Sequence, residues 1–248
     1  MVDTKAYTNL ATWFEYLNDD CGYDVWSQYL ILRLNTLYKG KRIYRGIDIG
    51  CGSGRFTRDF QKAGYLMCGV DVSAEMLSKA EELTAKENLN IRYFLGDIAK
   101  FKAFEKYDFA TAINDCFNYV PPTRIKSALK NVHRLLEQDG VFLFDISSER
   151  KFLKKIANTV CADDREDITY LAFNTLDGKK VTMDVTIFVR RKDGAIDRFD
   201  ERHVQYVYTE NEILQALEET GFDVISVEGH LGADKSESDR LLFTVKKR

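Results

Sequence analysis

The 248-residue sequence predicts an α/β fold in which a doubly wound sheet carries an inserted antiparallel sheet. Three observations predict it. Apolar runs alternate with helical stretches between residues 45 and 146, Asp-Gly pairs join strand-like runs between residues 168 and 208, and an α/β pattern returns at residue 209. Alternation of strands and helices is typical of a parallel sheet with helices on both faces.

The first α/β segment contains short apolar runs separated by stretches with apolar residues at helical spacing. We expect strands at Gly46–Ile49, Leu66–Val72, Ile91–Leu95, Phe109–Ile113 and Val141–Ile146. We expect helices at Arg55–Lys62, Ala74–Glu87 and Arg124–Glu137. Gly64 and Gly140 stand where glycines commonly end helices.

The middle segment has the pattern of consecutive hairpins. Its expected strands are Ile168–Asn174, Val181–Arg190 and Ile196–Tyr208, joined by Asp177-Gly178 and Asp193-Gly194. Asp-Gly between alternating runs is a strong hairpin signal. The second run alternates apolar and polar residues, so we expect an antiparallel sheet with one buried face.

The α/β pattern then returns, and a helical stretch precedes the first strand. Thr209 and Glu212 form a capping-box pattern for a helix over Glu210–Thr220, which Gly221 ends. Strands at Phe222–Val227 and Leu241–Val245 complete the pattern, and Asn9–Tyr38 is helical in period. The antiparallel sheet is therefore an insertion in one composite domain.

Composition excludes several classes of protein. The net charge of −3 argues against non-specific binding of nucleic acid, and no apolar run reaches the ~20 residues of a membrane span. The five cysteines form no Cys-x-x-Cys pair, which gives no sign of a disulfide framework or a metal site and favours a reducing, cytoplasmic location.

The most specific motif is the turn Asp48-Ile49-Gly50-Cys51-Gly52-Ser53-Gly54, in which a strand enters a helix through glycines. Such a turn binds a ligand where strand order reverses. A dinucleotide site requires Gly-x-Gly-x-x-Gly, but its third glycine position is Arg55 here. A carboxylate at Asp48 would repel a pyrophosphate and attract an ammonium. These features favour S-adenosylmethionine, with Asp48, Gly50, Cys51, Gly52 and Gly54 as candidate contacts.

Later strand ends supply further candidates. Asp71, followed by Val72, stands where a carboxylate accepts hydrogen bonds from ribose hydroxyls. Asp97 can accept a hydrogen bond from an adenine amino group, while Ile98 and Met76 offer apolar contacts to the ring. The loop from Asn114 to Tyr119 follows the fourth strand, where the reactive methyl group is expected.

On these motifs the chain resembles class I S-adenosylmethionine-dependent methyltransferases over residues 43–146 and 209–248. More loosely, it resembles small bacterial methyltransferases with an inserted antiparallel sheet, which are related to aminosugar N,N-dimethyltransferases. That likeness rests on Asp19-Asp20, Tyr23-Asp24-Val25-Trp26 and Arg198-Phe199-Asp200-Glu201-Arg202-His203. One departure is Phe14-Glu15 where such proteins commonly have Tyr-Asp.

The resemblance implies a Rossmann-like, seven-stranded sheet with its last strand antiparallel, S-adenosyl-L-methionine as cofactor and S-adenosyl-L-homocysteine as product. It divides the chain into N-terminal helices covering the site (1–42), the cofactor-binding core (43–146 and 209–248) and the inserted sheet (147–208).

For catalysis we single out His203 and Tyr119. His203 shares a strand face with Glu201 and Gln205, where it could be a general base or a structural hydrogen-bonding residue. Cys116 lacks the Pro-Cys context of a nucleophilic cysteine, so we expect a small buried loop residue there.

The resulting hypothesis is direct in-line methyl transfer to a nitrogen or oxygen of a small molecule, by a monomer or homodimer without nucleic acid, membrane or metal. Two alternatives stay open at this point. One is an RNA or protein methyltransferase, which predicts a basic rim around the cleft. The other is a non-catalytic S-adenosylmethionine-binding protein.

Overall fold

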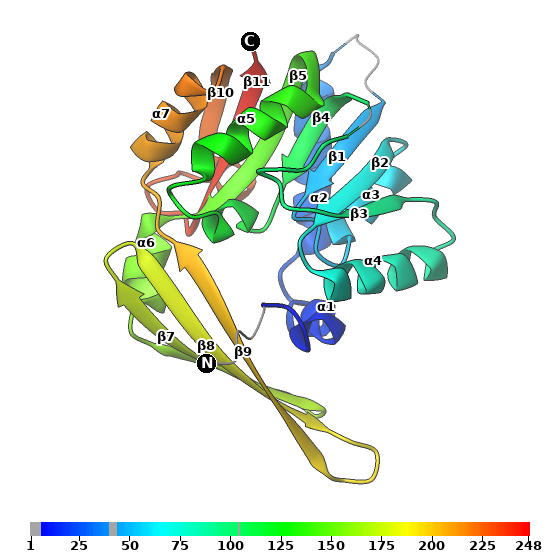
Figure 1. Cartoon of the computed structure of the whole chain (residues 1–248), viewed down its shortest axis with the longest axis vertical. Coiled ribbons are helices and arrows are strands. Elements are labelled where there is room, and N and C mark those ends of the chain that lie inside the picture. Colours follow the sequence, from blue (N-terminus) through cyan, green and yellow to red (C-terminus); the bar gives the residue numbers. More distant parts are fainter. Residues whose placement is uncertain (1–5, 40–43, 104) are drawn as a thin grey trace.

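The structure is a computed structural model that describes residues 6–39, 44–103 and 105–248. Figure 1 shows an α/β layer from which a ribbon of long antiparallel strands extends. The predicted boundary at residue 43 and the predicted start of the N-terminal region at residues 1–5 lie outside the described residues.

A seven-stranded sheet forms the first layer, and this confirms the predicted fold class. Its order is β10-β11-β5-β4-β1-β2-β3, and β11 is antiparallel to both of its neighbours. The strands are β1 (Arg45–Ile49), β2 (Leu66–Asp71), β3 (Arg92–Leu95), β4 (Tyr107–Ala112), β5 (Leu136–Ser147), β10 (Phe222–Gly229) and β11 (Arg240–Lys247). Strand order reverses at β1, which lies between β2 and β4, so the site is expected at the carboxyl end of β1.

Helices cover both faces of this sheet. One core gathers β-strand residues with α5 and α7, and another gathers aromatic residues of α2 and α3. The helices are α2 (Tyr23–Leu37), α3 (Arg55–Lys62), α4 (Ala74–Lys86), α5 (Ile125–Leu135) and α7 (Glu210–Glu219). The Thr209–Glu212 capping box is present, as predicted.

The antiparallel sheet has the order β6-β7-β8-β9. Its strands are β6 (Val160–Asp164), β7 (Ile168–Asp177), β8 (Lys180–Arg190) and β9 (Ile196–Tyr206). Val185 and Ile187 on β8 pack with Leu10 of the N-terminal segment, which confirms one buried face. β6 was not predicted, because this mostly exposed edge strand has no apolar alternation. The short helix α6 (Glu149–Lys151) and a wider turn, Phe152–Ile156, connect the two sheets.

The predicted N-terminal helices are present as a 3₁₀ turn (Leu10–Thr12), a short α1 (Phe14–Leu17) and α2, with Gly22 at a φ of 63° immediately before α2. One local expectation was wrong. Gly140 does not end a helix: α5 stops at Leu135, and Gly140 lies within β5 beside Asp139, which takes the positive φ of 63°.

Candidate active site

A cavity of about 600 Å³ lies at the predicted site. It is bordered by the turn after β1, the ends of β2 and β3, and the loop after β4. The predicted residues that line it are Gly50, Cys51, Gly52, Asp71, Val72, Met76, Asp97, Ile98, Asn114 and Tyr119. The fold therefore brings together most of the sequence-predicted cofactor residues, which lie far apart in the sequence.

The glycine turn is held by the carboxylate that follows β2. Asp71 Oδ2 accepts a hydrogen bond from the backbone N–H of Gly52 (2.8 Å), and Oδ1 accepts one from Ser73 (2.9 Å). Gly50 takes a φ of 63°, and a Cβ there would lie 2.1 Å from the sulfur of Cys116. This position needs glycine for both its conformation and its close approach to the next loop.

Two predicted cofactor residues do not line this cavity. Asp48 is buried beneath the turn, where its carboxylate accepts hydrogen bonds from the hydroxyls of Thr57 (2.6 Å) and Thr111 (2.8 Å). Gly54 begins α3, and a Cβ there would meet the Tyr93 hydroxyl at 2.4 Å. Neighbouring side chains therefore enclose both residues, and neither faces the cavity.

The cavity wall carries an excess of negative charge. Its carboxylates are Glu15, Asp71, Glu75 and Asp97, and its guanidinium groups are Arg55 and Arg124. Asp97 Oδ2 accepts a hydrogen bond from Arg124 (2.5 Å). Burial by itself raises the pKa of Asp97, but Arg124 and the backbone of Ala99 lower it overall. This balance suits a cationic ligand and disfavours a pyrophosphate.

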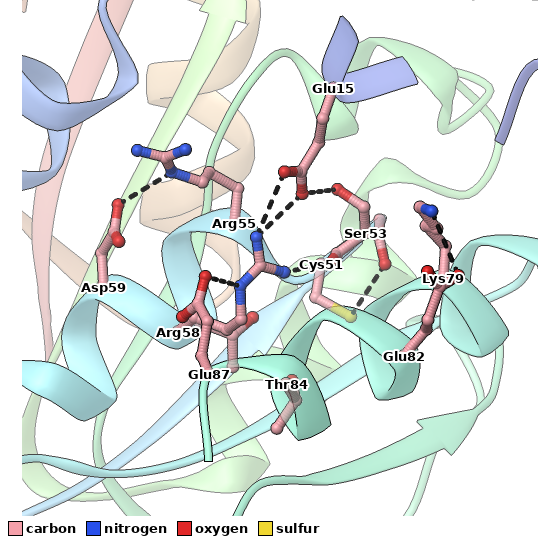
Figure 2. Close-up of polar contacts among 12 residues, drawn as sticks. Glu15, Cys51, Ser53, Arg55, Arg58, Asp59, Lys79, Glu82, Thr84 and Glu87 are labelled. Atoms are coloured by element: carbon pink, nitrogen blue, oxygen red, sulfur yellow. Dashed lines mark hydrogen bonds and ion pairs between the residues drawn. The ribbon is translucent and has the colours of Figure 1, made fainter. Parts of the chain in front are cut away.

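Glu15 reaches this cavity from the N-terminal helix α1. Figure 2 shows the guanidinium of Arg58 between the carboxylates of Glu15 and Glu87. Glu15 accepts hydrogen bonds from the Ser53 hydroxyl (2.6 Å) and from Arg58 (2.9 Å), whose side chain is only 1% exposed. Sequence reasoning noted Glu15 only as a departure from Tyr-Asp and missed Arg58. No short motif links these two positions.

A second cavity, of about 370 Å³, adjoins the first and is bordered by the inserted sheet. Tyr7, Phe14, Asn114 and Tyr119 line both cavities, so the two cavities meet at these side chains. Apolar and aromatic side chains from the N-terminal segment, the connecting turn and the inserted sheet line the second cavity: Leu10, Leu17, Ile156, Tyr170 and Met183.

The two predicted catalytic residues lie next to each other beside this second cavity. The Tyr119 hydroxyl is 3.2 Å from His203 Nδ1 and 2.8 Å from the hydroxyl of Tyr7. His203 Nε2 is 3.3 Å from Glu201 Oε2. Glu201 also accepts backbone hydrogen bonds from the segment Tyr7–Leu10. The polar face predicted on this strand is therefore buried and hydrogen-bonded.

A buried ionic cluster forms the other side of the second cavity. Arg240, at the start of β11, donates hydrogen bonds to Asp145 (2.7 Å), Asp115 (3.3 Å) and Asn114 (2.6 Å). Lys151 lies near it and donates to the hydroxyl of Ser147 (2.9 Å). Sequence reasoning gave Arg240, Asp115 and Lys151 no role, because their contacts join segments that are distant in the sequence.

The cysteines beside the cavity are thiols rather than thiolates. Burial raises the pKa of both Cys51 and Cys116 well above the ordinary value, and the nearby carboxylates raise it further. A cysteine nucleophile requires the opposite shift. The structure therefore gives Cys116 no sign of nucleophilic activation.

The comparison with protein families decides the class of the chain. Residues 47–140, which include the glycine turn and strands β2 to β4, match the model of a methyltransferase domain. Residues 47–140 form a methyltransferase domain, and the chain as a whole has the fold of a class I S-adenosylmethionine-dependent methyltransferase.

Whole-chain comparisons agree with this assignment. A Geobacillus sp. (strain WCH70) protein classed among the methyltransferases is 28% identical over 98% of this chain and 100% of its own length. The crystal structure of an S-adenosylmethionine-dependent methyltransferase from Clostridium acetobutylicum ATCC 824 covers 98% of this chain and 99% of its own, with 26% identity and a TM-score of 0.88.

A more distant likeness concerns the fold alone. CalS10, an amino pentose methyltransferase from Micromonospora echinaspora, has a TM-score of 0.75 and 20% identity over 95% of this chain and 96% of its own chain. These comparisons confirm the predicted resemblance and support S-adenosylmethionine as the cofactor. The roles of individual residues stay predictions. None of the described helices is long and apolar enough to cross a membrane.

Proposed function

We propose that the protein transfers a methyl group from S-adenosylmethionine to a nitrogen or oxygen of a small molecule by direct in-line displacement. The observation that carries this proposal is the pair of joined cavities. The larger contains the glycine turn and Asp71, the smaller contains His203, and Tyr119 lines both.

The volume and the lining charges of the larger cavity support our assignment of the cofactor to it. We assign Asp71 to the ribose hydroxyls, because its carboxylate lies at the cavity wall after β2. Asp97, Ile98 and Met76 would hold the adenine. Glu15, which lines the cavity beside the turn, replaces Asp48 as our candidate carboxylate for the ammonium group. The bound cofactor supplies an activated methyl group on a sulfonium.

The protein's own contribution is alignment and exclusion of water. Holding the acceptor atom close to the methyl group replaces an encounter in solution by a reaction within one complex. Phe14 and Tyr7 border the junction on the N-terminal side, and Asn114 and Tyr119 border it on the core side. His203, through Tyr119, can accept the proton that the acceptor loses.

A small-molecule acceptor is favoured over RNA or a protein side chain. The second cavity has about 370 Å³, which suits a small organic molecule. The methyltransferase of similar fold from Micromonospora echinaspora is named for an amino pentose. The net charge of −3 does not favour a polyanionic partner. Cytoplasmic location and a monomeric or dimeric state stay predictions.

The proposal is tested by methyl transfer from S-[methyl-³H]adenosylmethionine to a low-molecular-weight bacterial metabolite extract. We expect labelled small molecules with wild-type protein and none without protein. RNA and a protein extract serve as parallel acceptors. Label only in those fractions would reject the small-molecule assignment. Cofactor binding without transfer to any fraction would favour the non-catalytic alternative.

A further inference from the structure

We propose that Tyr7 presents the hydroxyl that receives the acceptor's proton, and that Tyr119 relays this proton to His203. This inference rests on the proposed function. It gives a role to a residue of the N-terminal segment for which the sequence offered none. It also makes Glu201 a positioning residue for the whole relay.

The direction of the hydrogen bonds follows from the carboxylate at one end. His203 Nε2 faces Glu201 Oε2 at 3.3 Å. Burial alone raises the pKa of Glu201, but hydrogen bonds from His203 and from the backbone of Leu10 lower it overall, so this carboxylate is ionised. An ionised carboxylate only accepts hydrogen bonds, so Nε2 carries a proton and donates it. In neutral imidazole the other nitrogen, Nδ1, is then an acceptor.

The two tyrosines continue this direction toward the cavities. The Tyr119 hydroxyl, 3.2 Å from Nδ1, must donate to it. Tyr7, 2.8 Å from Tyr119, then donates to the Tyr119 oxygen and keeps its own oxygen lone pairs for the acceptor. Burial raises the pKa of both tyrosines well above the ordinary value, so both hydroxyls keep their protons at neutral pH.

The backbone supports a functional role for Tyr7. Tyr7 has a φ of 61°, a left-handed conformation that is unfavourable for a bulky residue. The Glu201 carboxylate holds the segment in this conformation by accepting hydrogen bonds from the backbone N–H groups of Tyr7 (2.8 Å), Asn9 (2.5 Å) and Leu10 (2.9 Å). The rings of His203 and Tyr7 pack in a T-shaped arrangement, with centroids 4.7 Å apart. The same carboxylate therefore orients both ends of the relay.

The reaction balances without another reactant. The acceptor lone pair forms a bond to the methyl carbon, and the carbon–sulfur bond breaks with its electron pair going to sulfur. The acceptor's proton passes to the Tyr7 oxygen, the Tyr7 proton passes to Tyr119, and the Tyr119 proton passes to Nδ1. The resulting imidazolium is stabilised by the Glu201 carboxylate, and each tyrosine is again a neutral hydroxyl.

The relay is tested by NMR of the full chain labelled with ¹⁵N-histidine, which contains only three histidines. We expect His203 as the Nε2–H tautomer, with an Nδ1 resonance that shifts strongly in Tyr119→Phe and less, but measurably, in Tyr7→Phe. Tyr16→Phe is the matched control, because this half-exposed tyrosine lines neither cavity. The proposal is overturned if His203 is the Nδ1–H tautomer, or if its Nδ1 resonance does not shift in Tyr7→Phe.

Methyl transfer to the extract gives an independent result. We expect Tyr7→Phe to lower kcat roughly 10- to 100-fold, with the Kd for S-adenosylhomocysteine changed less than about twofold. Glu201→Gln should lower kcat and change the His203 tautomer spectrum together. An unchanged kcat in Tyr7→Phe contradicts the relay. Absence of transfer by wild-type protein contradicts the proposed function instead, and the NMR result then decides the hydrogen-bond order alone.

Discussion

The two cavities are built in different ways. The larger cavity, to which we assign the cofactor, is formed mainly by turns that directly follow neighbouring parallel strands. Its glycine turn is held by a hydrogen bond from Gly52 to Asp71, 19 residues apart. The second cavity, to which we assign the methyl acceptor, depends on hydrogen bonds between distant segments, such as that from Tyr7 to Glu201, 194 residues apart. A site built from consecutive elements leaves local motifs in the sequence, and a site built across segments does not.

The largest expected effect concerns the ion pair between Glu15 of the N-terminal helix α1 and Arg58 of α3. Replacing Arg58 by Met removes the buried guanidinium that Glu15 and Glu87 share, while both carboxylates stay partly exposed, so we expect a loss of about 3 kcal/mol in the free energy of unfolding. Urea denaturation measures it. Arg55→Met is the control, because its pairs with Asp24 and Asp59 are more exposed and should cost under about 1 kcal/mol. Equal losses in the two variants would contradict this difference.

The second prediction tests the cofactor side itself. We expect Asp71→Ala to abolish the thermal stabilisation of the protein by S-adenosylhomocysteine, a loss of about 2–3 kcal/mol in binding free energy. Because Asp71 also holds the Gly52 and Ser73 N–H groups, Asp71→Asn is included as a milder change. Calorimetric titration measures affinity, with Asp200→Asn on the exposed side of β9 as control. Unchanged affinity in both Asp71 variants would remove this residue from the site.

A third prediction concerns the carboxylate beneath the turn. Burial raises the pKa of Asp48 to about 6, despite the hydrogen bonds from Thr57 and Thr111 that lower it. The folded protein therefore holds a proton that the unfolded chain releases, and wild-type stability falls as pH rises from about 4 to 6. We expect Asp48→Asn to gain about 2 kcal/mol relative to wild type between pH 4.5 and 7.5. A pH-independent difference between the two proteins would show that Asp48 titrates normally.

The smallest effect is expected where the chain returns from the inserted sheet to the core. Thr209→Ala removes the side-chain cap of α7 and should destabilise the protein by about 1 kcal/mol. Cofactor affinity should not change, because Thr209 lines neither cavity. Thermal unfolding with and without S-adenosylhomocysteine measures both quantities. A changed affinity for S-adenosylhomocysteine in Thr209→Ala would mean that the connection from the inserted sheet to α7 influences the larger cavity.

The same contrast explains what could be predicted from the sequence. The strand-turn-helix pattern from Arg45 to Lys62 was predictable, because periodicity and glycines act locally. The position of Asp71 was predictable for the same reason. Asp48 was placed at the cavity because the sequence does not show that Thr57 and Thr111 would occupy its oxygens. Tyr7 and Arg240 were missed because their importance comes only from packing.

The hydrogen bond between Tyr7 and Glu201 has a consequence for the order in which a new chain matures. Closing a 194-residue loop costs about 2 kcal/mol more chain entropy than closing the 19-residue loop of the glycine turn. On the ribosome, the turn and Asp71 emerge about 130 residues before Glu201, roughly 10 s at ordinary synthesis rates. We therefore expect the nascent chain to form the cavity around the glycine turn first. The second cavity can form only after β9 has been synthesised, because Tyr7 must bind Glu201.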